Sequence, residues 1–225
     1  MSVPSAVRQL AAVVRKDVVL EWRGRELVSG MVLFAVLALL TFNFAFDLTG
    51  VNRAVAGAGA LWVALIFASL LGLGRSASVE RMHGAWEGVL LSPIDRGTLF
   101  LAKLVSSLLF LGLVDAVVLV LFAGLFGVPV LRLPVIGIVA LGTIGLALLG
   151  TLLSPMAATT RAREVLLPVM LFPLAVPVVI AAVRATVLVL TEQPRDAWAW
   201  IQLLAGFDLL FLGVGYLIFG AAAED

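Results

Sequence analysis

The sequence predicts an all-α integral membrane protein, a single transmembrane domain over residues 1–225 that crosses the bilayer with six transmembrane helices. Hydrophobic residues make up 63% of the chain and charged residues only 13%, and the mean hydropathy is +1.18. A soluble domain is closer to half apolar and a quarter charged, and a chain this short cannot hide so much apolar surface in a water-soluble core. Six apolar stretches, and an uneven distribution of Lys and Arg between their loops, complete the argument.

The composition also excludes several kinds of site. The net charge of +1 provides no bulk basic or acidic surface that would point to nucleic acid. The chain contains no cysteine, which excludes disulfides, thiolate metal sites and covalent haem attachment, and His83 is its one histidine. No metal site is therefore expected. Residues 1–26 lack the continuous apolar core of a cleavable signal peptide, so we expect the first span to be retained.

The N-terminal segment, residues 1–26, is periodic without being a span. We predict an amphipathic helix that lies in the cytoplasmic interface of the membrane. Its function is either to anchor the first span or also to dock on a cytoplasmic partner. The apolar residues at helical spacing are Val7, Leu10, Ala11, Val14, Val18 and Trp22, and the cations off that stripe are Arg8, Arg15, Lys16 and Arg23.

Six stretches have the roughly 20 mostly apolar residues that a spanning helix needs. They cover residues 27–46, 54–74, 104–131, 133–157, 165–190 and 198–223. Only a tight break near Gly127, Pro129 and Arg132 separates the third stretch from the fourth. These two spans are therefore expected to form a hairpin.

The cations in the loops predict the orientation. With six spans both termini share one side, and most Lys and Arg residues fall on that side. They are Arg8, Arg15, Lys16, Arg23, Arg25, Arg75, Arg81, Arg96, Lys103, Arg161 and Arg163, against Arg53, Arg132, Arg184 and Arg195 on the other. We expect both termini in the cytoplasm and the chain in a bacterial cell inner membrane. Arg184 is expected to snorkel to the periplasmic surface.

The second span carries a small residue at every fourth position. Such a row lets another helix approach closely, which is how helices associate in lipid. A helix-packing seam, within one chain or between two, is therefore favoured over a transport pathway. The row consists of Ala56, Ala60, Ala64, Ala68 and Gly72.

Two carboxylates lie inside predicted spans, Asp115 in the third and Asp208 in the sixth. A charge at the bilayer centre costs about 2.5–3.5 kcal/mol on insertion scales, so these residues should face the bundle interior or a partner. A structural hydrogen bond between helices is favoured over a proton relay or polar substrate path, because no Lys or His lies beside them.

The fifth span contains Pro168, Pro173 and Pro177. Each removes a backbone donor, so the helix should be kinked or broken. Broken helices line binding sites in some transporters, but a static kink explains the prolines equally well.

The longest link, residues 75–103, joins the second and third spans. Its apolar spacing predicts a short helix, a break and a second helix that enters the third span, with Ser92 as the cap and Pro93 in the first turn. A solvated connector is the plain alternative to a functional segment.

The residues of this link resemble those of a known family of membrane proteins. Glu80-Arg81, Gly84, Glu87, Leu90-Leu91-Ser92-Pro93 and Leu101-Ala102-Lys103 resemble the loop after the second span in ABC-2-type permeases. The Leu-Pro at 167–168 and the Pro-Leu-x-x-Pro at 173–177 are similar to a signature of the narrower CcmB family, the haem exporter B permeases of cytochrome c maturation. The match extends over nearly the whole chain. Trp86, where leucine is common, and the Glu-Gly-Val at 87–89 are small departures.

The resemblance implies a type II exporter-like permease, with residues 75–103 as a cytoplasmic coupling segment. It implies the ATPase CcmA as partner, together with CcmC, CcmD and the haem chaperone CcmE, and two copies of this chain. ATP would act through the partner subunit and haem would be handled by partner proteins. Hydrolysis would drive release of haem-loaded CcmE from CcmC, with haem export as a further alternative. The residues expected to contact the ATPase are Glu80, Arg81, Gly84, Glu87, Leu91, Ser92 and Pro93.

The residues themselves agree with this division of labour. No Gly-x4-Gly-Lys-Ser/Thr motif is present, so the chain is expected to be non-catalytic, with ATP hydrolysis in a separate subunit. Trp198 and Trp200 lack flanking histidines and are expected to form an interfacial aromatic belt rather than a haem site. Three alternatives stay open: a generic ABC-2 exporter of a lipid, glycan or drug, a proton-coupled secondary transporter, and a membrane scaffold.

Overall fold

A computed structural model of the chain describes residues 6–24, 26–46, 53–82, 95–157 and 163–221. This part of the chain is entirely helical apart from short turns, and six of its helices are long and apolar enough to cross a membrane. The helices are α1 (Ala6–Gly24), α2 (Glu26–Ala45), α3 (Arg53–Met82), α5 (Arg96–Phe126), α6 (Leu133–Ala157), α7 (Arg163–Leu190) and α8 (Pro194–Ala221). The predicted all-α fold with six spans is confirmed.

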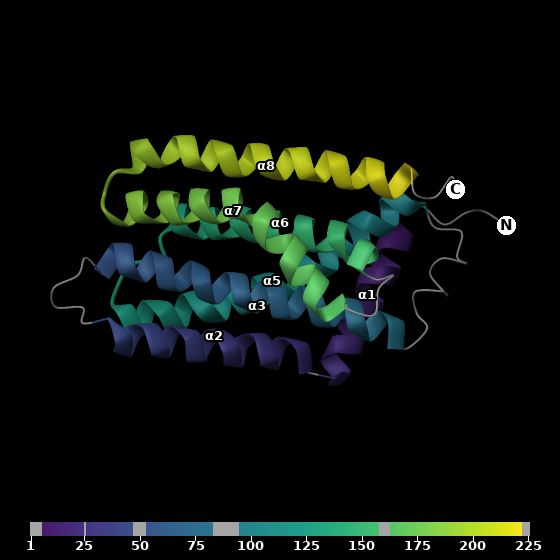
Figure 1. Cartoon of the computed structure of the whole chain (residues 1–225), viewed down its shortest axis with the longest axis horizontal. Coiled ribbons are helices and arrows are strands. Elements are labelled where there is room, and N and C mark those ends of the chain that lie inside the picture. Colours follow the sequence, from purple (N-terminus) through teal and green to yellow (C-terminus); the bar gives the residue numbers. More distant parts are fainter. Residues whose placement is uncertain (1–5, 25, 47–52, 83–94, 158–162, 222–225) are drawn as a thin grey trace.

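The six long helices run side by side along the long axis of the molecule and alternate in direction (Figure 1). One end of the bundle carries the beginnings of α2 and α5 and the end of α8. The turns that join α5 to α6 and α7 to α8 lie at the opposite end. The short helix α1 crosses the first of these ends instead of running along the bundle (Figure 1).

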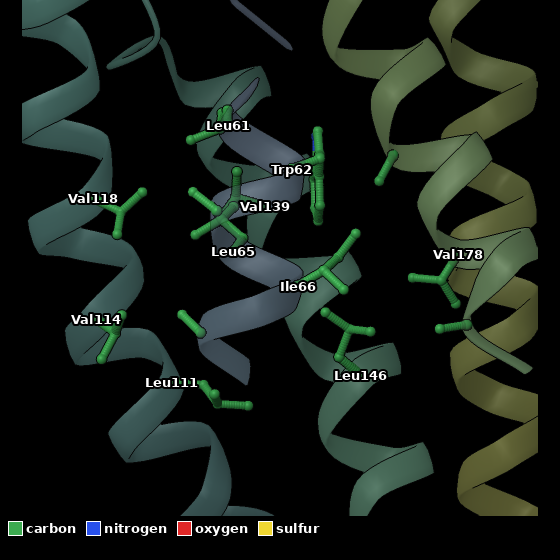
Figure 2. Close-up of a cluster of buried hydrophobic side chains, with 14 of the residues drawn as sticks. Leu61, Trp62, Leu65, Ile66, Leu111, Val114, Val118, Val139, Leu146 and Val178 are labelled. Atoms are coloured by element: carbon green, nitrogen blue, oxygen red, sulfur yellow. The ribbon is translucent and has the colours of Figure 1, made fainter. Parts of the chain in front are cut away.

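Helices α3 and α6 form the centre of the bundle. Of their most apolar windows, 61% and 72% of the residues are buried, against 22% for α2 and 17% for α8. Figure 2 shows Leu61, Trp62 and Leu65 of α3 among side chains from neighbouring helices, such as Val114 of α5 and Val178 of α7. The outer helices α2 and α8 therefore present most of their surface to the surroundings, which for a membrane protein are lipid.

Glycines of α6 allow this close packing. A Cβ atom on Gly142 would collide with the indole ring of Trp62, and one on Gly150 with the side chain of Leu73. The glycines therefore leave space on the surface of α6, and large side chains of α3 fill it. Small residues let helix backbones approach closely in lipid, where no hydrophobic force draws helices together.

Helix α5 begins and ends at different residues from those predicted for the third span. It starts at Arg96, because the Asp95 side chain accepts a hydrogen bond of 2.9 Å from the backbone N–H of Thr98 and so caps its first turn. The cap of this helix therefore falls at Asp95 instead of Ser92. The helix ends at Phe126, before position 131, because Gly127 has a φ of 62° and terminates it in the left-handed conformation.

Helix α7 is helical throughout Arg163–Leu190, so the prolines do not break it. It changes direction along its length in Figure 1. The side chains of Pro173 and Pro177 are exposed, on the outer side of the helix. Of the two expectations for this span, the break is wrong because the helix is continuous, whereas a role in lining a binding site stays a prediction.

Candidate functional site

The first candidate site is the contact between α1 and the beginning of α5. Val13 of α1 is buried against Leu99 and Ala102 of α5, and Leu10 and Val14 pack at its edge. This face differs from the stripe that the sequence predicts, because Val13 was not part of that stripe. Val7, which begins that stripe, is 75% exposed, and Ala11 is also exposed.

An ion pair closes the same contact. The ammonium nitrogen of Lys103 lies 3.1 Å from Oδ2 and 3.4 Å from Oδ1 of Asp17. Both side chains are largely buried, with 14% and 10% of their surface exposed. Lys16 lies beside the pair, its Nζ 3.1 Å from Oδ1 of Asp17, and is more exposed at 34%. Asp17 therefore joins two cations at the boundary between α1 and α5.

Glu21 ties the other end of α1 to α2. Its Oε1 accepts hydrogen bonds from the backbone N–H groups of Leu27, at 3.1 Å, and Val28, at 3.0 Å. The first N–H groups of a helix have no partner within the helix, so this carboxylate acts as a cap for α2. Helix α1 is thus held at two points, one on α2 and one on α5.

Of the residues predicted to contact the ATPase, the structure describes only two. Glu80 and Arg81 lie in the last turn of α3, where only the backbone is described. The other predicted contacts lie outside the described residues: Gly84, Glu87, Leu91, Ser92 and Pro93. His83 lies there too. What the structure shows is that the link leaves α3 after Met82 and reaches α5 at Arg96.

The two intramembrane aspartates lie on either side of α6. Asp115 of α5 is buried and accepts a hydrogen bond of 2.6 Å from the hydroxyl of Thr143. Asp208 of α8 is also buried, and its carboxyl faces Gly145, where a Cβ would lie 3.0 Å from Oδ1. Neither oxygen of Asp208 has a hydrogen-bond partner within the described part of the chain. The geometry fits the expected bond between helices at Asp115 and leaves Asp208 without one.

The predicted packing seam of α3 lies inside the bundle. Ala60, Ala64 and Ala68 are 2% exposed or less. A Cβ on Gly72 would lie 2.6 Å from Cε of Met31, so here the row allows a close approach of α2 within one chain. Trp62, on a different face of α3, is equally buried, and its indole N–H donates a hydrogen bond of 3.0 Å to the hydroxyl of Thr186.

Comparison with known proteins decides the family. A model of the family described as CcmB protein matches residues 8–224. The chain belongs to the CcmB family. No curated protein and no solved structure matches it.

Membership of the CcmB family makes the chain a multi-pass membrane permease subunit of a haem exporter system in cytochrome c maturation. A CcmB permease is a non-catalytic subunit without a directly bound cofactor, and ATP is hydrolysed by a separate subunit of the ABC system. Among the described residues no group of three His, Cys, Asp or Glu side chains is arranged to hold a metal ion.

Sequence reasoning missed three parts of the site in this CcmB permease. It did not pair Asp17 with Lys103, it did not assign Glu21 as a cap of α2, and it did not identify Val13 as the centre of the buried face. A signal was present, because Val13, Asp17 and Glu21 are spaced at every fourth position and therefore share one face of α1. The acidic residues obscured it, since a search for an apolar stripe passes over carboxylates.

Proposed function

We propose that this CcmB-family permease couples ATP hydrolysis by CcmA to the release of the haem-loaded chaperone CcmE from CcmC. CcmD is a further partner, and the complex contains two copies of the permease. The link of residues 75–103 contacts the ATPase through Glu80, Arg81, Gly84, Glu87, Leu91, Ser92 and Pro93. The permease lies in the bacterial inner membrane with both termini in the cytoplasm, where its Lys and Arg residues are concentrated.

The observation that carries this proposal is the pair of long helices on either side of the link. Helix α3 continues to Met82, past Gly74, where its apolar span ends, and α5 begins at Arg96. Both helices reach the opposite end of the bundle, where a Cβ on Gly57 of α3 would lie 2.9 Å from Cζ of Phe122 of α5. A displacement of the link therefore moves two rigid elements that remain packed together far from it.

Because α3 lies at the centre of the bundle, its displacement would be transmitted to several other helices. This helix contacts α2, α5, α6 and α7, so it touches most of the bundle. Nucleotide binding at the partner shifts the bundle only if the partner binds its two arrangements with different affinity. Because α3 touches four other helices, a shift of α3 changes the packing of each of them. The buried side chains of α3, among them Trp62 and Leu65, fill the centre of the bundle, which favours transmission over passage of haem through this subunit.

The experiment is a charge reversal in the link. The variant Glu80→Lys/Glu87→Lys is produced with CcmA, CcmC, CcmD and CcmE, and co-purification of CcmA in mild detergent is measured together with release of CcmE. We expect CcmA to be lost from the complex, and c-type cytochromes to fall. The matched control is Glu192→Lys/Asp196→Lys, which reverses two exposed carboxylates at the opposite end of the bundle.

Two results would count against the proposal. If the variant Glu80→Lys/Glu87→Lys bound CcmA normally, the link would not be the contact with the ATPase. If the control variant lost CcmA to the same extent, the loss would be a general effect of added positive charge on assembly.

A further inference from the structure

Helix α1 separates its charges between two faces. Both of its described carboxylates point toward the bundle, Asp17 at Lys103 and Glu21 at the N-terminus of α2. Arg8 and Arg15 are exposed, and neither has an ion-pair partner among the described residues. The two arginines are seven residues apart, which is two helical turns or about 10 Å. They therefore lie on one face, and no acidic side chain of α1 shares that face.

The side chains around the two arginines are small or apolar. Ala11 and Ala12 lie between them and are exposed, and Val19 continues the same face with 41% of its surface exposed. Small residues beside an arginine leave room for a bulky anion to reach the guanidinium group. The apolar residues suit a layer in which hydrocarbon lies next to the polar groups. We call Arg8, Ala11, Ala12, Arg15 and Val19 the outer face of α1.

The packing of α1 against the start of α5 is the basis for placing it relative to the membrane. Helix α5 has 31 residues, whereas the hydrocarbon core needs roughly 20. Lys103 marks the edge of the core, because the helix from there to Phe126 is long enough to cross it, at roughly 1.5 Å for each residue. Helix α1 packs against Leu99, Ala102 and Lys103, which precede the core. Taking Lys103 as the start of the core, we place α1 in the headgroup layer, near the level of the lipid phosphates.

We propose that the outer face of α1 binds anionic phospholipid, with Arg8 and Arg15 as the groups that contact the headgroup phosphates. Guanidinium groups form charge-assisted hydrogen bonds with phosphate. The inward turn of Asp17 and Glu21 removes the carboxylates that would repel the lipid. The ion pair and the cap thus do more than hold α1, since they also turn both of its carboxylates away from the outer face.

The absence of cysteine from the chain allows a local test. Val7→Cys, at an exposed residue beside the outer face, is labelled with a fluorophore in the full-length protein, which is reconstituted into vesicles of phosphatidylcholine that contain brominated phosphatidylcholine or brominated phosphatidylglycerol. Bromine quenches the fluorophore on contact, so the two lipids report their relative affinity for this face. We expect phosphatidylglycerol to quench more strongly, and added salt to weaken that preference, since salt screens exposed charges.

The variant Arg8→Gln/Arg15→Gln tests the two residues directly. A basic residue near an anionic surface contributes about 1 kcal/mol, which corresponds to about fivefold in affinity, so the preference should fall at least fivefold. Arg132→Gln/Arg195→Gln, which removes two exposed arginines at the opposite end, should leave the preference unchanged. Both variants alter exposed side chains, so helix content measured by circular dichroism should not change.

Three outcomes would overturn the proposal. Equal quenching by the two lipids would show that the face does not select anionic headgroups. An equal loss of preference in the Arg132→Gln/Arg195→Gln variant would assign the effect to overall charge. Protection of the label from both lipids when CcmA is added would show that the face docks a protein instead, a result that leaves the proposed coupling through residues 75–103 intact.

Discussion

Lys103 of α5 and Asp17 of α1 are 86 residues apart in the sequence, and their charged groups approach to 3.1 Å. The contact forms at the end of the bundle where α5 begins. It fixes the only described helix that does not run along the bundle (Figure 1). Together with the packing of Val13 on Leu99 and Ala102, the pair ties α1 to α5.

Breaking this pair should loosen α1 without unfolding the bundle. Asp17→Asn leaves Lys103 largely buried without its counter-charge, a loss of roughly 1–3 kcal/mol, between values for exposed and fully buried pairs. Hydrogen exchange of the α1 amides is expected to accelerate, while exchange in α6 stays unchanged. Lys16→Gln is the control, with a smaller effect because Asp17 and Lys103 then still neutralise each other. The swap Asp17→Lys/Lys103→Asp should restore protection in part, and equal exchange in all variants would contradict the role of the pair.

The cap on α2 can be separated from that ion pair. Glu21→Ala removes the acceptor for the N–H groups of Leu27 and Val28, at a cost of about 1 kcal/mol for a lost cap. We expect faster hydrogen exchange in the first turn of α2, with less change in Glu21→Gln, which retains an acceptor oxygen. An equal effect of the two substitutions would show that the charge matters and not the acceptor.

Two threonines of α6 offer a matched comparison. The hydroxyl of Thr143 donates to Asp115, whereas that of Thr151 is buried without a hydrogen-bond partner in the described part of the chain. Hydrogen bonds between membrane helices contribute about 0.6 to 1.7 kcal/mol. Thr143→Val should therefore lower the unfolding temperature in detergent, and Thr151→Val should leave it unchanged or raise it. The reverse order would exclude the Asp115–Thr143 bond as a stabilising contact.

A pair of glycines in the same helix tests the packing of α6. A Cβ on Gly142 would collide with the ring of Trp62, which is held by its bond to Thr186, whereas a Cβ on Gly137 meets no atom within 4 Å. Gly142→Ala should destabilise the bundle by about 1–3 kcal/mol, the usual cost of overpacking. Gly137→Ala should stabilise it by up to about 1 kcal/mol, because alanine favours the helix. Thermal unfolding followed by size-exclusion chromatography distinguishes the two, and equal melting temperatures would contradict the packing.

Hydropathy was sufficient to predict the six spans, because lipid demands long apolar stretches whatever their neighbours are. It was not sufficient to predict which faces meet. Trp62 and Phe67 both lie in the second predicted span, yet Trp62 is 1% exposed and Phe67 is 39% exposed. Bundle-facing and lipid-facing positions are both apolar in a membrane, so the pattern that separates them in a soluble helix is lost.

Contacts between distant parts of the chain could not be predicted from the sequence either. Asp115 was expected to bond another helix, but nothing in its surroundings pointed to Thr143 rather than to another hydroxyl. The start of α5 was missed because Pro93 after Ser92 is a strong helix-start pattern, while Asp95 with Thr98 is equally suited to capping. Local preference allowed both positions, and the tertiary structure places the cap at the second.

Asp208 provides the sharpest test of the two interpretations of the intramembrane carboxylates. Both of its oxygens are buried without a hydrogen-bond partner among the described residues, so its removal breaks no observed bond. A carboxylate within a span also costs up to about 3 kcal/mol on insertion scales. Asp208→Ala should therefore raise the unfolding temperature in detergent, in contrast to Thr143→Val. The level of c-type cytochromes in cells that carry the variant is measured in parallel. A lower unfolding temperature would show that Asp208 stabilises the bundle through an unseen partner. A higher unfolding temperature combined with loss of c-type cytochromes would assign this costly residue to function.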